Sequence, residues 1–236
     1  MRPVLRWNAD ERPIAWHVSP LRVTRVSVSL VQPLLLGLTL GVRHAFEPDH
    51  LAAITALASR TLSSKQAATT GAAWGLGHAA AIVMLGSLVV ACRVRVPSGI
   101  VLVLDLAVAG VLVVLAIQAL WIGKGAQPPP SSGAHVHGRR STVVGFVHGA
   151  SGTAAITLIC LTTFSSWAKA VGFLVLFALG ALISMSMLSG LLAGPLAAIA
   201  RKGERASRMM RVGGGLVALV AAVVVVISAL GSSGAS

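Results

Sequence analysis

Residues 41–51 read GVRHAFEPDHL, and this stretch decides how the chain must fold. Five of eight consecutive positions carry ionisable side chains, between two apolar runs: Arg43, His44, Glu47, Asp49 and His50. An Asp or Arg at the centre of a membrane helix costs about 3 kcal/mol, so such groups are rare there and usually functional. The stretch therefore predicts a polar site set inside an apolar helix.

The composition agrees with a membrane protein. Of the 236 residues, 56% are apolar and only 11% are charged, with a mean hydropathy of +0.86. Soluble domains carry roughly 25% charged residues, so this chain has too little polar surface to cover a core in water. We predict an all-α, multi-pass protein of the cell membrane, with lipid as a partner.

Six apolar segments recur along the chain, most with the ~20 residues that a membrane helix needs. They span about 28–58, 68–92, 97–122, 142–164, 168–194 and 212–231. A Pro- and Ser-rich joint at 123–141 is predicted to be a flexible linker. It separates a first three-helix half, 28–122, from a second, 142–231. A basic tail, 1–27, and a short tail, 232–236, lie outside them.

The net charge of +13 does not indicate nucleic-acid binding. The 19 basic residues are spread over short joints and the N-terminal tail, and the chain has no Tyr for base stacking. Basic residues beside membrane segments set orientation and attract anionic lipid. Glycine pairs four residues apart, such as Gly71 with Gly75 and Gly145 with Gly149, predict close helix packing. A homo-oligomer stays open.

Pro48 determines the predicted geometry of the polar stretch. On a straight helix His44 and His50 would lie ~120° apart. Pro48 offers no N–H to the carbonyl of His44 and disfavours helix at Glu47, so we expect the helix to open, freeing that carbonyl. Two imidazoles and the Asp49 carboxylate then converge, which suits Ni, Co, Zn, Cu(II) or Fe(II) rather than Mg or Ca.

The alternative is a buried ion-pair network of Arg43, Glu47 and Asp49, with the histidines as hydrogen-bonding filler. Two further histidines favour the metal site, because His78 and His148 also lie in apolar segments. We predict His44, Asp49, His50 and His78 as ligands. His148, Glu47 and Arg43 are predicted to line the route or to support the ligands.

These motifs resemble those of the nickel/cobalt transporter family. The resemblance rests on His44-x4-Asp49-His50 and on Leu76-Gly77-His78, and the layout with His148-Gly149 opening the second half is most similar to the six-helix, urease-accessory type of nickel permease. That group lies in the lysine-exporter-like superfamily. The resemblance implies movement of Ni²⁺ or Co²⁺ that feeds urease or hydrogenase maturation. Glu47, Pro48 and Ala79 depart from the family pattern, which usually has Asp, Ala and a hydroxyl residue there.

Other polar residues leave alternatives open. His135 and His137 in the joint are candidates for metal capture. Asp105 is either a pathway group or an ion-pair partner of an arginine before the third segment, Arg93 or Arg95, and we favour the pair. Cys92 and Cys160 form no CxxC motif and read most simply as small apolar residues.

The function predicted from these features is a permease and not an enzyme, with the divalent ion as cargo and no cofactor. Uptake is favoured and efflux is the near alternative. A second alternative is a membrane thiol-electron carrier that uses Cys92 and Cys160. A third is an assembly partner of a metalloenzyme without transport of its own.

Overall fold

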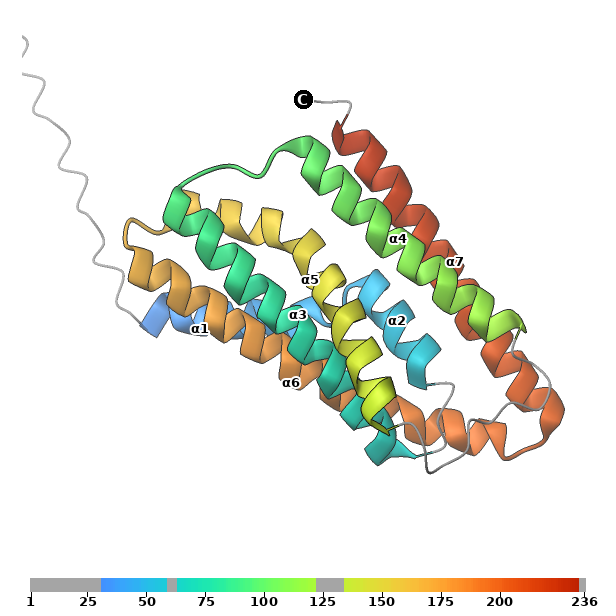
Figure 1. Cartoon of the computed structure of the whole chain (residues 1–236). Helices are drawn as coiled ribbons and strands as arrows, with labels where there is room; N and C mark the ends of the chain where they lie inside the picture. The colour runs from blue at the N-terminus through green and yellow to red at the C-terminus, as the bar shows by residue number, and fades with distance from the viewer. Residues whose placement is uncertain (1–30, 59–62, 122–133, 234–236) are drawn as a thin grey trace, which may run out of the picture.

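The computed structural model describes residues 31–58, 63–121 and 134–233, and these form seven α-helices without a strand (Figure 1). The helices are α1 (Val31–His44), α2 (Pro48–Ala58), α3 (Ser64–Cys92), α4 (Ser98–Trp121), α5 (Ala134–Thr163), α6 (Trp167–Ala200) and α7 (Glu204–Ser233). The predicted all-α fold is confirmed. The basic tail, 1–27, lies outside the described residues, as do 123–133 of the joint and the last three residues.

Five of the helices are long and apolar enough to cross a membrane: α3, α4, α6, α7 and the Gly138–Thr163 part of α5. Large apolar side chains are exposed on their outer faces, among them Val103 at 65% and Leu191 at 66%. In a soluble protein a surface of this kind would be unusual, whereas lipid covers it at no cost. The protein is therefore a multi-pass membrane protein.

The predicted first span, 28–58, is two helices instead of one. Pro48 is the first residue of α2, a position where its missing N–H costs nothing because that group has no helical partner there. The carbonyl of His44 accepts the N–H of Glu47 at 3.1 Å, so the prediction of a freed His44 carbonyl is wrong. With 14 and 11 residues, α1 and α2 are each shorter than the ~20 residues of a full span.

Several helices extend past the predicted apolar limits. α5 begins at Ala134, inside the predicted joint 123–141, and α6 and α7 leave only residues 201–203 between them. The reason is that hydropathy marks the part of a helix in lipid, whereas the backbone hydrogen bonds continue into the polar boundary. The side chains of His135 and His137, at the start of α5, lie outside the described ones.

The helices form two groups with α2 between them (Figure 1). α3 lies between α5 and α6, and α1 lies along α6. On the other flank α4 and α7 run side by side, and α2 contacts both of them as well as α6. Helices from the two predicted halves are therefore intermingled, because α3 packs on α5 and α6 while α4 packs on α7.

Glycines allow the closest helix contacts, as their spacing predicts. A Cβ at Gly145 of α5 would lie 1.9 Å from the carbonyl oxygen of Trp74, and one at Gly149 would lie 2.5 Å from that of His78. A Cβ at Gly41 of α1 would likewise lie 2.0 Å from the Phe177 carbonyl oxygen of α6. These backbones touch only because no side chain intervenes.

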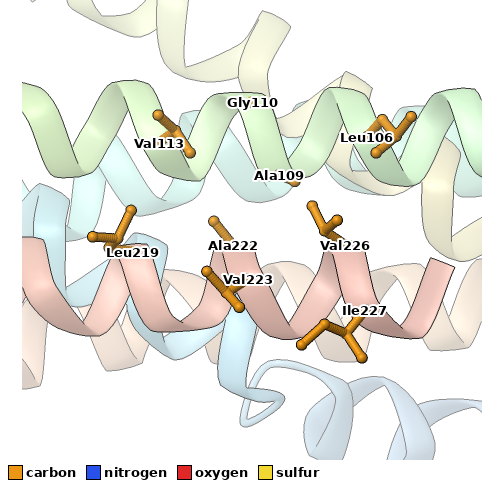
Figure 2. Close-up of a pocket in the computed structure, with 9 residues that line it drawn as sticks. All are labelled: Leu106, Ala109, Gly110, Val113, Leu219, Ala222, Val223, Val226 and Ile227. Atoms are coloured by element: carbon orange, nitrogen blue, oxygen red, sulfur yellow. The ribbon is translucent and has the colours of Figure 1, made fainter. Parts of the chain in front are cut away.

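The α4–α7 contact differs in character, as Figure 2 shows. Small residues, Ala109 and Ala222, lie where the two helices approach, and larger aliphatic side chains flank them. Together they line an apolar groove of about 320 Å³. No polar side chain contributes to it, so the groove carries no chemistry of its own.

Candidate metal centre

The break between α1 and α2 determines the positions of the first three polar side chains of the site. It puts His44 on the last turn of α1 and places Asp49 and His50 on the first turn of α2. Both histidines are buried, at 8% and 2% exposure. His78 of α3 and His148 of α5 complete the group and are buried as well. Four imidazoles from four helices therefore meet inside the molecule.

His50 lies at the centre of this group. Its ring centroid is 4.4 Å from those of His44 and His148 and 5.1 Å from that of His78. Two sets of donor atoms can be drawn around it, each with its atoms within 4.8 Å of one another. One set is His44, His50 and His78, and the other is Asp49, His50 and His148.

Two rings of the first set, His44 and His78, have the spacing of metal ligands. The Nε2 atoms of His44 and His78 lie 3.2 Å apart. Nitrogens at ~2.05 Å from one ion lie about 2.9–3.3 Å apart in octahedral or tetrahedral geometry. The same distance also fits an N–H···N hydrogen bond, so one proton or one metal ion can join the two rings. The Nε2 of His50 has no hydrogen-bond partner.

Asp49 belongs to the second set, where both of its oxygens are used. Its Oδ1 accepts from Nδ1 of His50 at 3.1 Å and its Oδ2 from Nε2 of His148 at 2.7 Å. An ionised carboxylate only accepts hydrogen bonds, so His50 carries its proton on Nδ1. Its Nε2 is then left with a free lone pair.

Glu47 holds the Nδ1 of His44 in the way that Asp49 holds the Nδ1 of His50. Its Oε2 lies 2.9 Å from Nδ1 of His44, which likewise turns Nε2 of that ring toward His78. A carboxylate on the far nitrogen of a ligand imidazole fixes its orientation and raises its basicity. Two carboxylates thus prepare two imidazoles in the same way, although Asp49 is largely buried and Glu47 is half exposed.

The residues predicted as metal ligands therefore do not all lie together. His44, His50 and His78 come together, whereas Asp49 lies behind His50 and is shared with His148. Arg43 is exposed, and among the described residues Glu47 and Asp49 pair with histidines instead of with it. The alternative ion-pair network built on Arg43 is therefore wrong.

Asp105 also differs from its favoured prediction. Its carboxylate accepts from the hydroxyl of Ser151 in α5. Arg93 and Arg95 are exposed, and neither forms an ion pair with it in the described part of the chain. Ser151 was not predicted, yet it lies three residues after His148, which places both on one face of the helix.

Two aromatic residues that sequence reasoning missed pack around the imidazoles. The Trp74 ring lies 5.6 Å from that of His50 and 5.5 Å from that of His148. Phe177 of α6 lies 5.1 Å from His44. Trp74 is one turn before His78, so its spacing was a usable signal. These rings close the apolar side of the cluster.

The thiols do not form a second centre. Cys92 is exposed at the end of α3, and Cys160 is buried in an apolar cluster with Phe173 and Leu174. Both are free. This placement favours their interpretation as structural residues over that of a redox pair.

Known proteins resemble this chain in the part that carries the cluster. The family described as "High-affinity nickel-transport protein" matches residues 31–124, which include α1 to α4 and three of the four histidines. The chain is also 25% identical over 187 residues to the urease accessory protein UreH of Bacillus sp. (strain TB-90), covering 74% of this chain and 82% of that protein. The predicted resemblance to nickel/cobalt transporters is confirmed. The chain is therefore similar to nickel-transport proteins over its first four helices. No solved structure matches it.

Proposed function

We propose that this membrane protein is a nickel permease of the cell membrane in which His44, His50 and His78 bind the ion during passage. The observation that supports it best is the convergence of three buried imidazoles from α1, α2 and α3. Asp49 and Glu47 hold two of these rings by Nδ1. Co²⁺ is the second expected cargo, since it accepts the same ligands.

The ligand chemistry explains selection. Imidazole nitrogens bind Ni²⁺ and Co²⁺ better than Mg²⁺ or Ca²⁺, which prefer oxygen. Three neutral ligands also hold an ion less tightly than thiolates would, and transport requires release as well as binding. The two nearby carboxylates offset part of the charge of the ion without occupying its ligand positions.

We infer uptake as the direction, with supply of nickel to a metalloenzyme such as urease or hydrogenase. The similarity to a urease accessory protein supports this destination. Efflux is the alternative direction. Expression in cells separates the two, because an importer raises cellular ⁶³Ni and an exporter lowers it.

Uptake by proteoliposomes that contain only this chain tests the proposal. We expect saturable ⁶³Ni uptake that Co²⁺ inhibits more strongly than Zn²⁺ or Mn²⁺. His50→Ala should reduce it at least tenfold, because this ring contacts every other member of the cluster. The double variant Cys92→Ser/Cys160→Ser is the control and should keep the wild-type rate. Uptake no greater than in empty vesicles, or a His50→Ala rate equal to wild type, would refute the proposal.

A further inference from the structure

Asp105 is a carboxylate in an apolar helix, where a charge costs free energy, and the metal cluster does not account for it. It is the only ionisable side chain in α4, whose most apolar 18-residue stretch has a mean hydropathy of 3.0. It is partly buried and accepts a hydrogen bond from Ser151. A carboxylate inside a membrane segment normally faces a partner or a water-filled cavity. No basic side chain pairs with Asp105 among the described residues.

A cavity connects Asp105 to the histidines. It has a volume of about 330 Å³, and its lining includes Asp105, Ser151, Glu47, Asp49, His50 and His148. It lies between the α1–α2 break, α4, α5 and α7. At ~30 Å³ per water it has room for about ten waters. That space is enough for a cation that keeps its own hydration shell.

A separate observation indicates a polar occupant. His148 is 3% exposed and lines the cavity, yet its Nδ1 has no hydrogen-bond partner. His50 is another residue of the lining, and its Nε2 has no hydrogen-bond partner either. Buried polar atoms are nearly always paired, so these two nitrogens point to water or a cation as their partner. The residues that line the cavity thus include imidazoles as well as the Asp105 carboxylate and the Ser151 hydroxyl.

We propose that Asp105, with Ser151, forms a second cation-binding position, which holds a hydrated divalent ion before the ion moves to the imidazoles. This inference rests on the proposed function. Oxygen ligands hold a divalent ion without removing its water, whereas nitrogen ligands replace water and choose the metal. Asp105 therefore sets how readily an ion is captured, and the imidazoles set which ion is passed. Successive weak positions of this kind favour conduction.

The test compares Asp105→Asn and Asp105→Glu with wild type in proteoliposomes, with ⁶³Ni as the probe. Asp105→Asn should raise the KM for nickel about tenfold, the lower end of the loss when a supporting carboxylate is removed, with Vmax nearly unchanged. Asp105→Glu should restore most of the affinity. Val103→Asn is the matched control, because it places the same amide on the exposed side of α4.

Binding of Co²⁺ to the purified chain supplies a readout other than transport. Wild type should bind two equivalents, and Asp105→Asn should bind one, with the visible spectrum of nitrogen-ligated Co²⁺ retained. The spectrum also shows that the variant is folded. If Asp105→Asn does not assemble, Ser151→Ala replaces it, with a smaller rise in KM expected.

The outcomes separate the two proposals. If wild type takes up nickel and neither Asp105→Asn nor Ser151→Ala changes KM, the second position is refuted while the permease stands. If wild type takes up no nickel, the permease is refuted, and Co²⁺ stoichiometry alone decides the second position. Equal stoichiometry in wild type and Asp105→Asn would overturn it.

Discussion

At the scale of single residues, the chemistry of the site depends on which nitrogen of each histidine is free. Asp49 occupies Nδ1 of His50, and Glu47 occupies Nδ1 of His44. In both rings this leaves Nε2 for a metal ion. The two acids differ in their surroundings, because Asp49 accepts from two buried rings while Glu47 is 53% exposed.

This difference predicts unequal effects of two isosteric changes. In Asp49→Asn, one oxygen becomes an NH2 group that faces an N–H of His50 or His148, so one ring must turn or lose its partner. We expect nickel affinity to fall by about 10- to 100-fold. Glu47→Gln should cost less than about tenfold, since water can replace an exposed partner. Titration of both purified variants with Ni²⁺ checks the order, and equal losses would contradict it.

At the scale of elements, the contact between α3 and α5 decides where His78 and His148 meet. Gly145 lies against the backbone of Trp74 and Gly149 against that of His78. Each glycine is within three residues of a histidine of the cluster. The helix crossing and the site are therefore built by the same residues.

Adding a single methyl group at this contact should push α3 and α5 apart. In Gly145→Ala, the new Cβ would lie 1.9 Å from a carbonyl oxygen that cannot move alone. We expect a loss of about 1–3 kcal/mol in stability, as for other overpacked cores, and a weaker nickel site. Gly110→Ala is the control, because nothing lies within 4 Å of its Cβ. Thermal unfolding in detergent measures both, and a Gly145→Ala variant as stable as Gly110→Ala would argue against this contact.

At the scale of the whole molecule, the ligands come from three helices, and His78 of α3 joins two histidines from the stretch at the α1–α2 break. They are all imidazoles, which must be neutral to bind an ion. The pH at which binding fails therefore reports the ligand set of the assembled bundle.

Nickel binding should weaken as pH falls, because protons compete with the ion for the imidazole nitrogens. Burial disfavours a charged ring, so the loss of affinity should begin at a lower pH than for an exposed histidine. Nickel titrations of the purified chain from about pH 7.5 downward measure this loss, with circular dichroism as the control for folding. Affinity that stays constant down to the pH at which the chain unfolds would show that the imidazoles are not the ligands.

The sequence by itself was sufficient for the membrane class, the positions of the long helices and the break before Pro48. Each of these depends on local properties, namely apolar run length and the missing N–H of proline. It also indicated the four histidines, since a polar ring in an apolar helix is conspicuous.

Only the tertiary structure decided how these residues are used. It placed Asp49 behind His50 and not beside His78, joined Asp49 to His148 and brought Asp105 to Ser151. Spacing along a helix fixes the face on which a side chain lies, but it does not fix which face of another helix lies opposite. That choice follows from backbone contacts at Gly41, Gly145 and Gly149, which act between helices far apart in the chain.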